Sequence, residues 1–203
     1  MASKTYEFAS WPASEAYLSN PSIIQPVFGY LKASKGINEI YQGLQTEQPN
    51  IYVINTWDEL KDHQNLIEDK ENYSALGVHT ARTRSENSEE SIVHAIFLED
   101  PRGAFGAPVT EIAHITPKEG VAPGAVEEVL VAILGWRSDP DVVVRGGAYG
   151  RLVEKPETFV LVLGWDTVED HINTVTAGAP EQVVAKLKSV GLVELVHVKF
   201  KSI

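Results

Sequence analysis

Three of the six histidines fall in stretches where apolar and polar residues alternate, as they do in strands. His94, in IVHAIF, has Ile92 and Ile96 two residues away on either side, so the pattern places all three on one buried face. Burial keeps an imidazole neutral near pH 7 and able to accept a proton. His94 is therefore the first candidate for a general base, with a hydrogen-bonded core histidine as the alternative. His197 takes the equivalent place later in the chain, and His114, in EIAHIT, is a candidate for substrate contact.

An amide and an indole lie two residues apart in IYVINTW, and hence on one strand face. A buried Asn55 needs a hydrogen-bonding partner, which a ligand could supply. Trp57 could stack on a flat substrate, although a large ring at a strand end is also a common core anchor. Tyr52 could orient a phenol or a carbonyl. The matching segment FVLVLGW keeps the indole as Trp165 but has Leu163 in place of the amide, so the first segment is the better candidate for catalysis.

A helix is predicted to begin directly after each of these tryptophans, at Asp58 and at Asp166. Each acid occupies the position of an N-cap. One turn later the first helix carries Asp62 and His63. Adjacent helix residues point about 100° apart, so Asp62 is not expected to orient His63. His63 is nevertheless a candidate to line a pocket with His94 and Asn55.

Several other kinds of site have no matching pattern. No HxH, HxxxH or HExxH spacing occurs and there are no cysteines, so no metal site and no cofactor is predicted. The glycine cluster Gly146–Gly150 lacks the spacing of a phosphate-binding loop and is better explained by a turn that needs positive φ. The nucleophile elbow GxSxG is also missing.

The elements that must position these residues occur twice. Residues 57–65 read WDELKDHQN and residues 165–173 read WDTVEDHIN, with five of nine positions identical at an offset of 108 residues. The repeat predicts a tandem duplication. Each copy reads strand, helix, strand, strand, helix, strand, which is the split βαβ or ferredoxin-like order. We expect repeat 1 over residues 1–100 and repeat 2 over 107–203, joined through the Gly- and Pro-containing segment 99–108.

Both faces of the predicted strands IYVINTW and FVLVLGW are apolar, so both faces should be buried. Helices can cover one face of each sheet, and the two sheets can cover each other. The predicted fold class is therefore α+β: two tandem ferredoxin-like repeats that form an intrachain α+β barrel.

Composition narrows the classes of partner. The chain has 203 residues, 43% of them hydrophobic, and carries a net charge of −11 with a pI near 5.0. Nucleic acid and anionic membranes would favour clustered Lys and Arg, so neither is an expected partner. No apolar run has the length of a signal peptide or of a membrane span. The expected location is therefore the cytoplasm.

Four segments together carry a family resemblance: VINTWDELKDH, VLGWDTVEDH, TEIAHITPKEG and the glycine turn at Gly146–Gly150. A strand that ends in Trp, followed by Asp and a helix with an acid–His step, resembles the dimeric α+β barrel superfamily. Its antibiotic-biosynthesis-monooxygenase-like branch is the most similar. The resemblance covers nearly the whole chain as two copies. Most members build the barrel from two chains, so it implies a pseudo-dimer in one chain and leaves a further homodimer open.

The resemblance implies chemistry on small molecules. The superfamily includes cofactor-independent oxygenases of aromatic polyketides, haem-degrading oxygenases, polyketide cyclases, isomerases and stress-associated proteins. We therefore expect a cofactor-free oxygenase, cyclase or isomerase that abstracts a proton from an aromatic or polyketide-like substrate in an apolar pocket. The alternative is a noncatalytic stress-associated or ligand-binding barrel protein, and haem stays open by fold analogy alone. A cavity of hundreds of Å³ with His94 or Asn55 on its wall favours the enzyme, whereas a filled interior favours the alternative.

Overall fold

The computed structural model describes residues 4–203. Its internal contacts divide the chain into two compact units, one reaching Ile96 and including Lys201–Ile203, the other spanning Phe97–Phe200. Each unit combines an antiparallel sheet with helices, which confirms the predicted mixed α+β class. No helix in this part of the chain combines the length and apolar character needed to cross a membrane.

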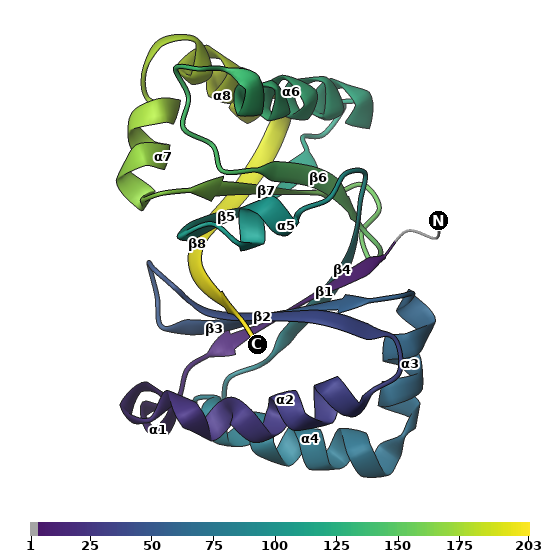
Figure 1. Cartoon of the computed structure of the whole chain (residues 1–203). Helices are drawn as coiled ribbons and strands as arrows, with labels where there is room; N and C mark the ends of the chain where they lie inside the picture. Colours follow the sequence, from purple (N-terminus) through teal and green to yellow (C-terminus); the bar gives the residue numbers. More distant parts are fainter. Residues whose placement is uncertain (1–3) are drawn as a thin grey trace. The chain divides into compact units, whose positions relative to one another are not determined.

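The first unit contains a four-stranded antiparallel sheet in the order β4–β1–β3–β2. Figure 1 shows α2 and α4 together along one face of this sheet. Their apolar side chains pack onto Ala9, Trp11 and Val53 from the strands. In chain order its elements are β1 (Thr5–Pro12), α1 (Glu15–Ser19), the 3-10 turn η1 (Pro21–Ile24), α2 (Gln25–Ala33), β2 (Ile37–Gln45), β3 (Asn50–Trp57), α3 (Leu60–Glu68), α4 (Lys70–Thr83) and β4 (Ser91–Phe97).

The second unit has the corresponding strand order, β8–β5–β7–β6, again antiparallel. Helix α6 supplies Val126, Leu130 and Ile133 to a core shared with Leu161 and Trp165 of β7. Its elements are α5 (Arg102–Phe105), β5 (Val109–Pro117), α6 (Pro123–Gly135), the 3-10 turn η2 (Trp136–Ser138), β6 (Gly147–Leu152), β7 (Phe159–Trp165), α7 (Val168–Val175), α8 (Gly178–Val190) and β8 (Gly191–Ser202).

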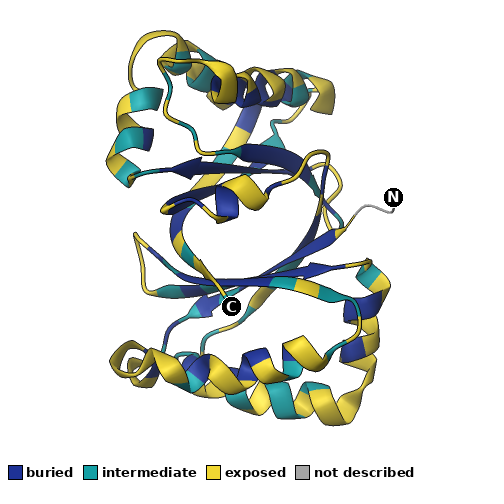
Figure 2. Cartoon of the chain, in the orientation of Figure 1, coloured by how far each residue is buried: buried dark blue, intermediate teal, exposed yellow. Residues whose placement is uncertain are grey.

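The central strands are buried on both faces, as their sequences predicted. Every residue of β7 is buried, and so are six of the eight residues of β3. Figure 2 shows these strands in dark blue, while the outer faces of the helices are exposed. Trp57 and Trp165 have no exposed surface, so both rings are core residues whatever else they do.

Two local predictions were wrong. Asp58 and Asp166 do not cap helices: α3 begins after Glu59 without a side-chain cap, and Thr167 caps α7 by accepting a hydrogen bond from the Asp170 amide. Asp58 instead accepts a hydrogen bond from Asn38, and Asp166 pairs with Arg145 through two bonds of 2.8 Å. Both helices start later than predicted, and each acid instead binds a side-chain donor.

The predicted glycine turn is confirmed only at Gly146, because Gly147–Gly150 belong to strand β6. Gly146 has φ +135°, where residues with a side chain are rare. A Cβ at this position would lie 2.8 Å from the backbone carbon of Gly103. The segment between the predicted repeats is not fully irregular, because it contains the short helix α5.

Candidate functional site

Strand register brings three polar residues into one row in the first unit. Glu7 of β1 lies opposite Asn55 of β3 on one side and opposite His94 of β4 on the other. All three are buried, with exposed fractions of 4%, 2% and 8%. Burying three adjacent polar side chains is unfavourable unless they form hydrogen bonds. The hydrogen bonds of these three residues therefore define the candidate site.

The Glu7 carboxylate is held by two donors. Its Oε2 atom accepts a hydrogen bond of 2.7 Å from the Trp57 indole N–H and one of 3.1 Å from the Asn55 amide. Both donors lie two residues apart on β3, as the sequence indicated. Trp57 is therefore a hydrogen-bond donor as well as a core anchor, because its N–H fixes the rotamer of a buried acid.

His63 of α3 completes the group from the helix side. Its Nδ1 atom lies 2.7 Å from Nε2 of His94, a hydrogen bond, and 3.6 Å from Oε2 of Glu7. Its ring stacks on Trp57, with centroids 5.1 Å apart and planes 13° from parallel. The neighbouring Asp62 does not take part and lies near Gly36 and Lys35. His63 is thus oriented by the strands rather than by its helix neighbour, which agrees with the 100° separation of adjacent helix residues.

A cavity of about 200 Å³ opens beside this group, within the first unit. Glu7, Asn55 and His63 form one part of its wall, and Tyr73, Arg84, Glu90 and apolar side chains from the sheet, α2 and α4 form the rest. Arg84 and Glu90 lie 3.7 Å apart and are each about one third exposed or less. His94 is not part of the wall: it contacts the ring of His63.

One polar atom at this cavity lacks a protein partner. Asn55 Oδ1 is buried and accepts no hydrogen bond among the described residues. The amide orientation follows from the carboxylate beside it, because a carboxylate accepts and only the NH2 group can donate. A buried carbonyl oxygen without a donor is unfavourable, so this atom suits a ligand O–H or N–H.

The second unit repeats the arrangement with two changes, one in a strand residue and one in the orientation of the helix histidine. Glu111 of β5 lies opposite His197 of β8 and opposite Leu163 of β7. Glu111 Oε2 accepts a 2.9 Å hydrogen bond from the Trp165 indole, and His171 Nδ1 lies 2.7 Å from His197 Nε2. Leu163 stands where the first unit has Asn55, so this carboxylate has one side-chain donor fewer.

Burial controls protonation in the second unit. It raises the pKa of Glu111 to about 7, although the Trp165 hydrogen bond acts in the opposite direction. It lowers the pKa of His171 to about 4, and the neighbouring His197 adds to that effect. His171 is therefore neutral near pH 7, while Glu111 is divided between its neutral and charged forms.

A second cavity, of about 310 Å³, lies beside Glu111 and His171. Its other lining residues are mainly aliphatic and come from β5, β7, α8 and neighbouring elements, with Trp136 and Lys188 also on the wall. The second unit is therefore not filled by its own side chains. The two cavities differ in polarity rather than in presence.

Two predicted substrate-binding residues lie apart from these groups. Tyr52 and His114 occupy the strand faces opposite to Asn55 and Glu111, and neither lines either cavity. His114 is partly buried, and burial lowers its pKa. The structure thus brings together Asn55, Trp57, His63 and His94 in one unit and places Trp165 in the corresponding group of the other.

The two glutamates were not identified from the sequence. Glu7 and Glu111 lie 104 residues apart, each in an alternating strand and on the face that carries Ala9 and Ala113. A charge on the apolar face of a strand, repeated in both copies, was the available signal. The constant offset of 108 residues that relates the tryptophans does not pair the two acids.

The first unit also contains a candidate ligand set for a metal, formed by Glu7, His63 and His94. Each of the three residues offers one ligand atom, and these atoms all lie within 4.8 Å of one another. All three residues are buried. No spacing motif could show this group, because its members come from β1, α3 and β4.

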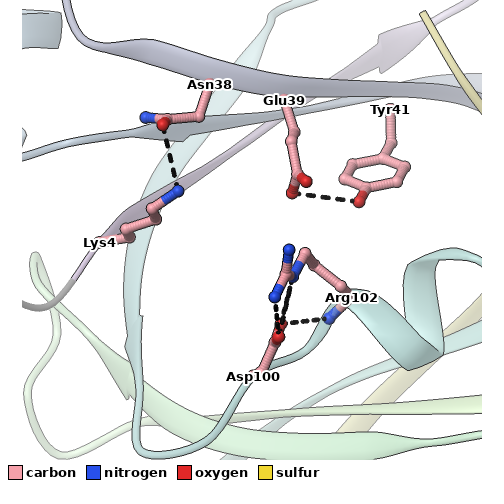
Figure 3. A network of polar contacts seen from close by, with 6 residues as sticks. All are labelled: Lys4, Asn38, Glu39, Tyr41, Asp100 and Arg102. Carbon is pink, nitrogen blue, oxygen red and sulfur yellow. Dashed lines mark hydrogen bonds and ion pairs between the residues drawn. The ribbon is translucent and has the colours of Figure 1, made fainter.

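Two of the polar contacts in Figure 3 are more exposed than this group. Lys4 donates to Asn38 in the first unit, and Arg102 forms a charged pair with Asp100 in the second, all four being exposed. Water competes for exposed pairs, so such contacts contribute little to stability and offer no enclosed site.

Comparison with known proteins gives structural matches only. No protein-family model and no curated protein matches the chain. Among solved structures, an anthrone oxidase-like protein matches with TM-score 0.68 and 11% identity, covering 99% of this chain and 92% of its own. The "putative monooxygenase" of Fusobacterium nucleatum matches with TM-score 0.66 and 8% identity over 99% and 94%. A mutant chlorite dismutase from Candidatus Nitrospira defluvii matches with TM-score 0.57 and 13% identity over 98% and 92%. At these identities the matches show the fold alone.

Proposed function

We propose that this chain is a small-molecule enzyme that abstracts a proton from an aromatic or polyketide-like substrate without a cofactor, in the cavity of the first unit. The observation that carries the proposal is the buried Glu7–His63–His94 group with His63 and Asn55 on the cavity wall. Asn55 Oδ1 adds support, because this buried acceptor has no protein donor among the described residues and a substrate hydroxyl could supply one.

In this proposal His63 is the base and His94 is a positioning residue. His63 faces the cavity and would take the proton, while His94 holds the ring through the 2.7 Å hydrogen bond. The Glu7 carboxylate, 3.6 Å from His63 Nδ1, would stabilise the imidazolium that forms. Asn55 Oδ1 would accept a hydrogen bond from a substrate hydroxyl, and the Trp57 ring would hold His63 by stacking.

The deprotonated substrate would be the reactive species. It would react with dioxygen, cyclise or take up a proton at another carbon, and these three outcomes correspond to oxygenase, cyclase and isomerase chemistry. The structural matches to a monooxygenase and an anthrone oxidase-like protein support the first outcome through the shared fold alone.

Cavity size limits the substrate. An engineered cavity of about 150 Å³ holds one benzene molecule, so about 200 Å³ suits one substituted ring. A fused multi-ring polyketide would exceed this volume unless α2 and α4 moved apart. We therefore propose a one-ring substrate, with the ring between the apolar strand residues and the helices, and a hydroxyl at Asn55.

The proposal is tested by mass spectrometry of small molecules retained by the purified protein, followed by turnover assays with one-ring and two-ring phenols under air. We expect turnover of a one-ring phenol that is lost in His63→Gln and kept in the corresponding variant of the second unit, His171→Gln. Absence of turnover across the panel, with no aromatic molecule retained, would support the noncatalytic alternative instead.

We also propose that the two units are ferredoxin-like copies produced by a tandem duplication, with the boundary within residues 99–108. The support is the nine-residue repeat, the corresponding strand order and the recurrence of Glu, Trp and two His in each unit. Expression of residues 1–100 and 107–203 as separate chains, followed by circular dichroism, would test whether each copy folds.

A further inference from the structure

We infer that the first unit contains a binding site for one divalent first-row transition-metal ion, such as Zn²⁺ or Fe²⁺, formed by Glu7, His63 and His94. This inference concerns the triad used in the proposed function but does not depend on that function. Two imidazoles and one carboxylate, with no thiolate, form a ligand set typical of catalytic zinc and of non-haem iron.

Two of the three distances between ligand atoms require only a small adjustment, and the third, between Glu7 and His94, is at most 4.8 Å. Ligand atoms about 2.0–2.1 Å from a tetrahedral zinc lie roughly 3.3 Å from each other. His63 Nδ1 and Glu7 Oε2 are already 3.6 Å apart, whereas His63 Nδ1 and His94 Nε2, at 2.7 Å, would have to separate by about 0.6 Å. Metal would thus replace the hydrogen bond between the two rings, and the ring that donated the proton would carry it on its other nitrogen instead.

Neighbouring groups already support such a site. The Trp57 N–H and the Asn55 NH2 both donate to the Glu7 carboxylate and fix its orientation, as the outer hydrogen bonds of metal sites do. Three protein ligands leave coordination positions open, and two of the three, Glu7 and His63, lie on the cavity wall. A water bound to the ion could donate to Asn55 Oδ1, the buried oxygen that has no protein donor.

The second unit serves as an internal comparison because its ring is turned differently. His171 presents Nδ1 to His197 at 2.7 Å but Nε2 to Glu111 at 3.4 Å. The imidazole therefore stands between the other two groups, and a single ion cannot replace both contacts. Leu163 also removes the oxygen that would hold a metal-bound water. One ion per chain follows, in the first unit.

An ion here would bind His63, the proposed base, at Nδ1, and His94 at Nε2. The proton of the neutral His63 ring would then lie on its other nitrogen, which could no longer accept one. Metal-loaded and metal-free protein would therefore differ in the chemistry of the first unit, and loading would inhibit the proposed proton abstraction. Binding itself can be measured without any substrate, so the outcome for the metal site and the outcome for the proposed enzyme are independent.

The test is titration of chelator-treated full-length protein with Zn²⁺ and with Co²⁺, followed by isothermal calorimetry and, for Co²⁺, by its ligand-field absorption. We expect one equivalent bound, with affinity reduced at least 100-fold in His94→Gln and in Glu7→Gln. The matched variant His197→Gln should keep both stoichiometry and affinity. Trp57→Phe, which removes the supporting hydrogen bond and reduces the ring stacked on His63, should weaken binding by about 10-fold or more.

Circular dichroism checks that each variant is folded, and Glu7→Gln replaces His94→Gln if the latter fails that check. Absence of binding by the unmodified protein would overturn the inference. So would binding that both first-unit variants leave intact, or that His197→Gln abolishes, because the ion would then lie elsewhere.

Discussion

His63 Nδ1 lies 2.7 Å from His94 Nε2, and only His63 of the pair lines the cavity. The two histidines therefore differ in position. His63, on helix α3, lies on the cavity wall, and His94, on β4, contacts it from behind. The same pair recurs as His171 and His197 at the same distance.

His63→Gln is expected to lower turnover of the substrate by about 100-fold or more, which is the usual effect of losing a general base. His94→Gln should also lower turnover, because glutamine does not hold the His63 ring in the same way. The measurement is kcat and KM after a substrate has been identified, with circular dichroism to show folding. Equal loss in His171→Gln would show that the chemistry is not confined to the first unit.

Asn55→Leu copies the second unit's residue into the first and should reduce activity by raising KM, since it removes the acceptor for the substrate hydroxyl. The reciprocal change, Leu163→Asn, should leave turnover nearly unchanged. It should cost about 1–3 kcal/mol of stability because Leu163 is buried among apolar side chains. Steady-state kinetics and chemical denaturation test the two halves of this prediction. A gain of activity in Leu163→Asn would contradict it.

The pH dependence of stability should contain two opposing contributions from the second unit. The pKa of Glu111 is about 7 when folded and 4.5 ordinarily, so between these pH values the folded state holds a proton that the unfolded state has lost. Its contribution to stability therefore falls as pH rises. The pKa of His171 is about 4 when folded and 6.5 ordinarily, so its contribution rises over that interval.

Between pH 5 and 6 the two contributions should nearly cancel. Relative to the unmodified protein, Glu111→Gln should therefore gain stability with rising pH, by on the order of 1.4 kcal/mol per pH unit. His171→Gln should lose stability with a similar slope. Urea unfolding at several pH values measures both. Slopes parallel to that of the unmodified protein in both variants would show that neither group titrates as described.

Gly146→Ala should be more destabilising than Gly120→Ala. Both glycines have positive φ, but a Cβ at Gly120 meets nothing within 4 Å, whereas one at Gly146 would overlap the Gly103 backbone. We expect about 1 kcal/mol for Gly120→Ala and roughly 3 kcal/mol or more for Gly146→Ala. Denaturant midpoints of the two variants provide the comparison, and equal midpoints would refute it.

Local patterns were sufficient to predict the mixed α+β class, the two-sided burial of β3 and β7, and the shared face of Asn55 and Trp57. They could not place His63 against His94, because that contact depends on where α3 packs over the sheet. The intrachain barrel stays a prediction from the apolar second face of each sheet.

The two acids show a different limit of sequence reasoning. A Glu within a strand is usually exposed to solvent, even where its neighbours two residues away are apolar. Its burial is evident only once the register sets Glu7 between Asn55 and His94. Side-chain competition likewise decided the helix starts, because Asn38 and Arg145 engage the acids that were expected to act as caps.

The near-parallel stacking of Trp57 on His63 gives the first unit its own optical reporter. An indole in van der Waals contact with an imidazole loses fluorescence when that ring becomes cationic, because the cation accepts an electron from the excited indole. The rings of Trp165 and His171 are tilted by 35°, so the angle between indole and imidazole differs between the two units. Emission from Trp57, isolated by replacing the other three tryptophans with phenylalanine, would report the electronic state of His63 continuously and without any added dye.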